Sequence, residues 1–99
     1  EIEPETNEPD LKQIDTISNQ WLATGDLEII ELNRQLKLEL PESDDHYTLA
    51  GFLLEKLQQV PSVGDLLLFK DITFEVIAMK GPRIDKVKLI LPSFDREKN

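Results

Sequence analysis

Apolar side chains after residue 48 recur every three or four positions, the period of an α-helix with one buried face. We expect this face to hold Leu49, Phe52, Leu53, Leu57 and Val60. Thr48 is the candidate N-cap, because its hydroxyl can accept a hydrogen bond from a free amide of the first turn. Gly51 either allows close packing or adjusts the entry into the helix. Pro61 cannot donate the next helical hydrogen bond, so the helix should stop there, and Gly64 and Asp65 predict a turn into a strand.

Two shorter apolar runs begin the chain. The run 11–17 and the run 20–24 predict a β-hairpin that turns near Ser18 and Asn19. A single amphipathic helix over residues 10–18 is the alternative, because short apolar patterns fit both periods.

A second helix is predicted within residues 27–37. Gly25 and Asp26 close the preceding strand with turn chemistry, and Asp26 is the candidate N-cap. The face expected to be buried holds Ile29, Leu32 and Leu36.

Three apolar runs after residue 65 predict a three-stranded antiparallel meander. They span residues 66–69, 72–79 and 83–91. Lys70 and Asp71 give the first turn the two-residue spacing of a hairpin, although neither is the glycine or asparagine that favours a primed turn.

The apolar face of this meander follows from strand alternation. It should hold Ile72, Phe74, Val76, Ala78, Val87, Leu89 and Leu91. Ile84 has the opposite parity, which predicts either a β-bulge or a late strand start near Asp85. Helices in one block and antiparallel strands in others predict an α+β fold. We expect two helices packed on a mostly antiparallel sheet, built from an N-terminal hairpin and a C-terminal three-stranded meander.

Composition divides the 99 residues into three parts. Residues 1–10 form an acidic linker with two prolines, residues 11–92 form one domain, and residues 93–99 form a polar tail. Since the chain begins with glutamate, we expect it to be a piece of a longer protein. No apolar run approaches the roughly 18 residues of a membrane span, so direct membrane insertion is not expected.

The residues of enzymatic sites are sparse. The chain has no cysteine, which excludes disulfides and thiol chemistry, and its one histidine is His46 in a polar loop. The acidic loop 42–46 lacks the alternating oxygens and glycine of a calcium site, so no metal site is predicted. No phosphate-binding glycine motif occurs, because the glycines stand singly at Gly25, Gly51, Gly64 and Gly81. We therefore predict no catalytic residues and no enzyme.

The basic residues Arg83, Lys86 and Lys88 could form a patch on the last strand. A net charge of −9 and the lack of neighbouring aromatics disfavour nucleic acid. A solvated strand face is the favoured interpretation, and contact with an acidic neighbouring domain is the alternative.

Aromatic residues lie within the predicted elements or at their borders. We expect Trp21, Tyr47, Phe52, Phe69 and Phe74 to belong to the core rather than to a ligand platform, with Trp21 as a core or edge anchor.

A series of short motifs follows the predicted elements in order. They are Trp21 and Gly25, then Leu32-Asn33, Leu40-Pro41, Thr48 with Gly51, Val60-Pro61 with Gly64-Asp65, Phe74 with Val76, and finally Arg83, Ile84 and Val87. Over roughly residues 12–91 this series resembles the CorC/HlyC transporter-associated domain.

Three stretches depart from that family's usual pattern. Lys70 and Asp71 occupy a turn that often contains glycine, and Gln58 and Gln59 stand where Gly-Arg is common. Residues 81–84 read Gly-Pro-Arg-Ile instead of the frequent Gly-Arg-Arg-Ile, which weakens any ligand role for that loop.

The resemblance implies a noncatalytic, cytoplasmic regulatory domain at the C-terminus of a membrane-associated protein. Such domains usually follow a pair of CBS domains, often with a membrane domain, in proteins linked to magnesium and cobalt efflux or called hemolysin-like. Their partners would be the CBS-pair and membrane domains of the same chain. A similar domain ends some cation/proton antiporters, which is one alternative. The fold is also similar to part of the FAD-binding domain of certain flavoenzymes, so FAD or an adenine nucleotide is a second alternative by analogy.

Overall fold

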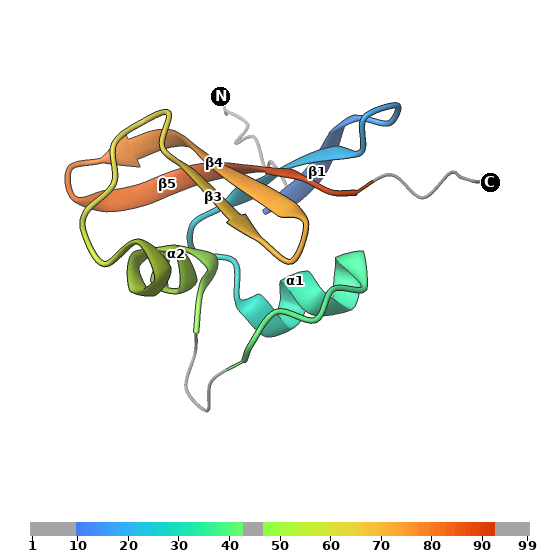
Figure 1. The fold of residues 1–99 in the computed structure, drawn as a ribbon, viewed down its shortest axis with the longest axis horizontal. Coiled ribbons are helices and arrows are strands. Elements are labelled where there is room, and N and C mark those ends of the chain that lie inside the picture. Colours follow the sequence, from blue (N-terminus) through green and yellow to red (C-terminus); the bar gives the residue numbers. More distant parts are fainter. Residues whose placement is uncertain (1–9, 43–46, 93–99) are drawn as a thin grey trace, which may run out of the picture.

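The computed structural model describes residues 10–42 and 47–92. This part of the chain forms one antiparallel sheet with two helices on one side of it (Figure 1). The elements are β1 Leu11–Asp15, β2 Gln20–Thr24, α1 Ile29–Leu36, α2 Leu49–Leu57, β3 Leu66–Phe69, β4 Ile72–Lys80 and β5 Arg83–Ile90. The α+β class, the N-terminal hairpin and the C-terminal meander are confirmed, and the alternative helix over 10–18 is wrong. The acidic stretch 43–46 lies outside the described residues.

The predicted N-terminal hairpin and C-terminal meander form one sheet, in which β2 of the hairpin pairs with β5 of the meander. Its order is β1-β2-β5-β4-β3, and every neighbouring pair is antiparallel. Trp21 of β2 pairs with Leu89 of β5, so β5, the last of the described strands, lies at the centre of the sheet. Alternation within each run predicted the strands, but it carried no information on this long-range pairing.

The turn between β3 and β4 has the spacing that the sequence predicted. Lys70 and Asp71 both have positive φ, at 52° and 68°. Two consecutive left-handed residues are the geometry of a type I′ turn, which matches the twist of paired strands. These side chains therefore occupy a conformation that glycine or asparagine would adopt at lower cost.

The first turn of α1 is capped by backbone rather than by the predicted side chain. Asp26 is not the N-cap; Glu28 takes that position and makes no capping hydrogen bond with its side chain. The amide of Ile29 instead donates to the carbonyl of Tyr47 at 2.8 Å. A β-bridge between Glu28 and Thr48 accompanies this bond, so the starts of the two helices are tied together.

α2 begins as predicted and ends earlier. The hydroxyl of Thr48 accepts from the amide of Gly51 at 3.1 Å, which confirms the N-cap. At the other end Gln58 adopts a left-handed conformation, with φ of 58°, and closes the helix before Pro61. Val60 therefore leaves the helical face and is 59% exposed, so its predicted burial is wrong.

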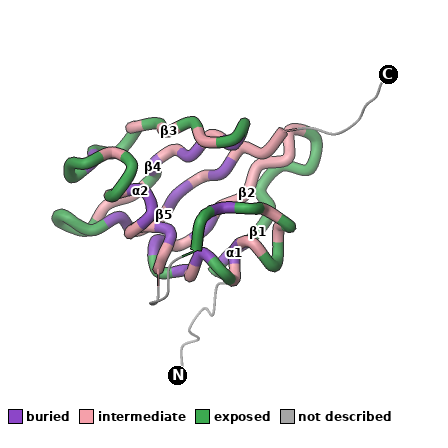
Figure 2. Tube along the Cα trace, turned by 60° about the horizontal axis from the view of Figure 1, so that its bottom comes forward, coloured by how far each residue is buried: buried purple, intermediate pink, exposed green. Residues whose placement is uncertain are grey.

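The core lies between the sheet and the helices, where the buried stretches of six elements converge and β3 packs against them with the partly buried Leu67 and Phe69 (Figure 2). Phe52 of α2 is at its centre, with ring centroids 5.2 Å from Phe69 and 5.5 Å from Phe74. Phe52 and Phe74 are fully buried, whereas Trp21 and Tyr47 pack at the margin. The expected core role of the aromatics is confirmed for the phenylalanines at its centre.

A β-bulge brings Ile84 into this core. Ala78 pairs with Lys86, but its neighbour Met79 pairs with Ile84, so Asp85 is the additional residue on β5. Of the two predictions for this stretch, the bulge is confirmed.

Close packing of backbone occurs at Gly25 rather than at Gly51. A Cβ at Gly25 would lie 2.1 Å from the carbonyl oxygen of Ile84. The Gly25 amide donates to the carbonyl of Asp85 at 2.9 Å, and its carbonyl accepts from Ala50 at 3.0 Å. A Cβ at Gly51 would meet only ordinary contact distances, so close packing does not explain that glycine.

Candidate functional site

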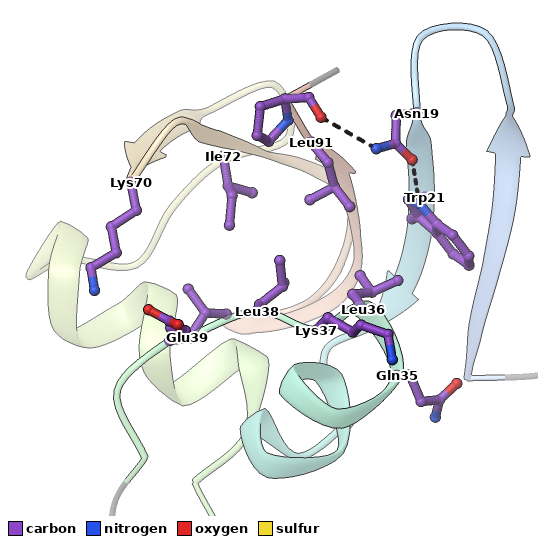
Figure 3. A pocket seen from close by; sticks show the side chains of 12 residues that line it. Asn19, Trp21, Gln35, Leu36, Lys37, Leu38, Glu39, Lys70, Ile72 and Leu91 are labelled. Carbon is purple, nitrogen blue, oxygen red and sulfur yellow. Dashed lines mark hydrogen bonds between the residues drawn. The ribbon is translucent and has the colours of Figure 1, made fainter. Parts of the chain in front are cut away.

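A groove opens between the end of α1 and the near end of the sheet (Figure 3). Its volume is about 480 Å³. It is lined by Asn19, Trp21, Gln35, Leu36, Lys37, Leu38, Glu39, Leu40, Lys70, Ile72, Leu91 and Pro92. The volume is in the range of small-molecule sites, roughly 300–1,000 Å³.

The Asn33 side chain shapes the lower wall of this groove. After α1, Lys37 adopts a left-handed conformation and the chain turns back along the sheet. The Asn33 amide nitrogen donates to the carbonyl of Leu40 at 2.9 Å, and the Asn33 amide oxygen accepts from the amide of Leu40 at the same distance. The same nitrogen donates to the Glu42 carboxylate at 2.7 Å. One side chain thus holds the segment 37–42 against α1.

The opposite wall is fastened around Asn19. The indole nitrogen of Trp21 donates to the Asn19 amide oxygen at 3.0 Å, and the Asn19 amide nitrogen donates to the carbonyl of Pro92 at 3.4 Å. The backbone amide of Leu91 donates to the Asn19 carbonyl at 3.1 Å. These polar groups already satisfy one another, so this wall presents mainly apolar surface.

The groove suits a flat apolar group better than a dinucleotide. Leucines, Ile72 and Trp21 supply apolar surface, while Lys37, Glu39 and Lys70 lie at the rim (Figure 3). The helix end that borders the groove is the C-terminus of α1, whose partial charge is negative and disfavours phosphate. None of the lining residues belongs to a helix N-terminus or a glycine-rich loop, the usual cradles for a pyrophosphate.

The predicted basic patch is a set of ion pairs. Lys86 and Lys88 project from the same side of β5, whereas Arg83 lies at the start of the strand. The pairs join Lys88 to Glu75 at 3.3 Å, Lys86 to Asp85 at 3.9 Å and Arg83 to Asp26 at 3.4 Å. Because each cation has a carboxylate beside it, the patch offers little free charge to a nucleic acid.

Tyr47 and Glu55 form another pair of titratable groups. The phenol donates to the Glu55 carboxylate at the margin of a hollow that also includes Pro41, Glu42 and Lys56. Burial, and then the bond to and charge of Glu55, raise the pKa of Tyr47 to about 12. A phenol with this pKa stays protonated near neutral pH, where it cannot act as a base.

The motif residues are spread over the fold and fasten backbone. Besides Asn33 and Thr48, Asp65 accepts from the amide of Ser62 at 2.9 Å, and its carbonyl accepts from the amide of Val76 at 3.0 Å. Trp21 and Leu40 are the motif residues that line the groove. The other lining residues were not predicted as a site, because the apolar ones look like ordinary core residues in the sequence and the polar ones like ordinary surface residues. Within residues 10–42 and 47–92, no group of three or more acidic, histidine or cysteine side chains could hold a metal ion.

Comparison with known proteins decides the family. The sequence profile of the transporter associated domain CorC_HlyC matches residues 13–93. The chain belongs to this family. No helix within the described part of this CorC_HlyC domain has the length and apolar character needed to cross a bilayer.

Relatives of this CorC_HlyC domain are much longer proteins. It is 36% identical over 86 residues to UPF0053 protein sll0260 of Synechocystis, which covers 84% of this chain and 19% of that protein. It is 32% identical over 82 residues to the polyamine export protein of Salmonella typhimurium, covering 82% and 18%. The chain therefore spans less than a fifth of these relatives.

A solved structure shows the same fold. The CorC_HlyC domain of a Xylella fastidiosa hemolysin, solved in complex with Mg²⁺ and Mn²⁺, is 28% identical and superimposes with a TM-score of 0.67. The match covers 82% of this chain and 98% of that domain.

Proposed function

We propose that residues 11–92 form a noncatalytic regulatory domain of a longer, membrane-associated transporter-type protein. The domain would lie on the cytoplasmic face, follow a CBS pair, and modulate ion transport through contacts with other domains of its own chain. The observation that carries this proposal is the family match to a domain that makes up less than a fifth of its relatives.

The pattern of hydrogen bonds supports an architectural role for the family motif. Asn33, Thr48 and Asp65 use their side chains to hold backbone amides and carbonyls. A catalytic motif would instead gather reactive groups around one position. Residues that preserve a shape suit a domain that acts through its surface.

The names of relatives suggest the cargo of the longer protein. One relative is a polyamine export protein, and the Xylella hemolysin domain was solved with Mg²⁺ and Mn²⁺. We take the transported species to be a cation, either an organic polyamine or a divalent metal. The cation/proton antiporter alternative shares this charge class.

Deletion of residues 12–91 from the longer protein tests the regulatory role. We expect export of the cation, or its response to an effector, to change while the protein still reaches the membrane. Export should be followed separately in cells loaded with a polyamine and in cells loaded with Mg²⁺. Unchanged transport and an unchanged effector response in both would refute the proposal.

The alternative of an FAD or adenine-nucleotide module can be tested in the isolated chain. Trp21 is the one tryptophan of the chain and lines the groove, so its fluorescence reports on any occupant. Because the groove provides no phosphate cradle, we expect titration with FAD or ATP to leave this fluorescence unchanged after correction for absorbance. Saturable quenching that a Leu38→Arg substitution abolishes would favour the ligand module instead.

A further inference from the structure

One face of the sheet is not covered by the helices (Figure 1). We call it the open sheet face. Strand register places two rows of side chains across it, from β1 to β3. The first row is Lys12, Leu22, Lys88, Glu75 and Leu66, and the second is Asp15, Gln20, Ile90, Thr73 and Leu68.

The open sheet face is apolar at the β3 side. Leu66 is 60% exposed and Leu68 is 70% exposed, and Ile77, two residues beyond the Leu66 partner Glu75 on β4, is 36% exposed. Residues 66–69 read Leu-Leu-Leu-Phe, and within the described residues no strand pairs with the outer edge of β3. Natural proteins usually protect such an edge with a charge, a proline or a bulge.

The opposite edge shows this protection. β1 carries Lys12 and Asp15, and its register shifts between Gln13 and Asp15. A charged, bulged strand does not readily accept another strand. The two edges of one sheet therefore differ, and only β3 offers an apolar, regular edge for pairing.

The open sheet face carries charges of both signs. Its lysines are Lys12, Lys86 and Lys88, and its carboxylates are Glu75 and Asp15. Asp15 is engaged by the hydroxyl of Ser18 at 2.8 Å. Lys88 pairs with Glu75 at 3.3 Å and Lys86 with Asp85 at 3.9 Å, so Lys12 on β1 is the lysine of this face for which the described residues provide no ion pair. A complementary surface would be apolar opposite β3 and acidic opposite Lys12.

We propose that the open sheet face, together with the free edge of β3, docks on another domain of the same longer protein, at a surface that is apolar opposite β3 and acidic opposite Lys12. This inference rests on the proposed function, because it places the chain within that protein. The contact supplies the physical route by which the domain would influence its neighbours.

The size of the face suits a contact between domains of one chain. Five strands at about 4.8 Å spacing and roughly 20 Å in length give a face of about 400 Å². Contacts between domains bury roughly 600–1,500 Å² in total, about 300–750 Å² on each side. A stable complex of separate proteins usually needs about 800 Å² per partner.

Two other occupants fit less well. A two-fold dimer through this face would bring Lys12, Lys86 and Lys88 of both copies into one interface. An anionic membrane surface would attract the lysines but repel a chain with a net charge of −9. A different, acidic protein surface satisfies both the apolar and the charged groups.

Hydrogen exchange in the purified full-length protein tests the proposal, with the isolated chain as reference. Amides of residues 66–69 should exchange at least about tenfold more slowly in the full-length protein, whereas amides of α1 should exchange alike in both. Leu68→Glu or Lys12→Glu in the full-length protein should remove this protection. The matched control is Ile30→Glu, since Ile30 is 58% exposed on α1, on the helical side of the sheet.

Equal exchange of residues 66–69 in both forms would overturn the inference, whatever the variants do. A dimer of the isolated chain that Leu68→Glu dissociates would overturn it in favour of a second copy. Binding of the isolated chain to phosphatidylserine vesicles through the same residues would overturn it in favour of a membrane. The deletion of residues 12–91 is measured by transport, whereas docking is measured by hydrogen exchange. If the deletion changes transport but residues 66–69 are not protected, only the docking inference is refuted. If residues 66–69 are protected but the deletion leaves transport unchanged, only the proposed function is refuted.

Discussion

Replacing Gly25 with alanine should separate the residue after β2 from β5 and from the start of α2. The added Cβ would lie 2.1 Å from the Ile84 carbonyl oxygen, well inside any contact distance that real atoms show. The obstacle is backbone within the sheet, which cannot rotate away as a side chain can. Either β5 or the turn after β2 must move.

Both movements break hydrogen bonds. The Gly25 amide loses Asp85, at 2.9 Å, and the Gly25 carbonyl loses the amide of Ala50, at 3.0 Å. Each net loss is worth about 0.5–1.5 kcal/mol, and displacement of the fully packed Ala23 and Ile84 adds a similar amount. We expect destabilisation by about 3 kcal/mol, or a melting temperature lower by about 12–24 °C.

Urea denaturation of the isolated chain, followed by circular dichroism, measures this effect. The matched control is Gly51→Ala, which introduces the same methyl group at ordinary contact distances inside α2. Alanine is the better helix former, so the control should gain about 0.5–1 kcal/mol. If Gly25→Ala stays within 1 kcal/mol of the parent chain, the close approach described here does not constrain the fold.

Three further substitutions test local features. Asn33→Ala should cost about 2 kcal/mol in urea denaturation, because it removes both hydrogen bonds to the Leu40 backbone; a cost below 0.5 kcal/mol would contradict the role given to this side chain. Asp71→Gly should stabilise by about 0.5–1 kcal/mol, since it relieves a residue with φ of 68°, and destabilisation would argue against the type I′ turn. Tyr47 is the one tyrosine, so ultraviolet absorbance should give its pKa directly, at about 12, and Glu55→Gln should lower it. Since folding raises this pKa from 10.0, the Tyr47 phenol should contribute to the free energy of unfolding below pH 10, and this contribution should disappear between pH 10 and 12. A titration of Tyr47 near pH 10 in the folded chain would refute the burial of the phenol.

Local rules predicted most of the elements. Alternating apolar residues identified β4 and β5, and the displaced parity of Ile84 was enough to indicate a bulge. The hydroxyl of Thr48 followed by an apolar helical period identified the start of α2. Each of these signals is contained within a few neighbouring residues, which is why sequence alone reveals it.

The start of α1 and the role of Gly25 depend on contacts that are distant in sequence, whereas the end of α2 is set by its own neighbouring residues. The sequence favoured Asp26 as the N-cap of α1. In the structure the amide of Ile29 donates to the carbonyl of Tyr47, which lies just before the other helix. Val60 fitted the helical period, but the left-handed Gln58 ended the helix first. Gly25 looked like turn chemistry, and only the approach of Ile84 explains why it must lack a side chain.

The candidate site was less predictable than the fold. Asn33 was recognised as part of a motif, but its two bonds to Leu40 could not be foreseen from spacing. The groove combines the end of α1 with the ends of three strands, so it depends on sheet order. The open sheet face likewise needed the register, because the apolar run 66–69 does not by itself say that Leu66 and Leu68 lie on an uncovered face at the edge of the sheet.

The position of β5 has a consequence for synthesis on the ribosome. The central strand of the sheet is the last of the described elements to be made, and both β2 and β4 pair with it. Until β5 leaves the exit tunnel, the N-terminal hairpin has no sheet to join and α2 has only part of its packing surface. Pairing of β2 with β5 also closes a loop of more than sixty residues, from Thr24 to Lys86 at its shortest. Folding should therefore be slow for a domain of this size and occur in one late step after translation of the whole segment, when any upstream domains of the same chain have already folded.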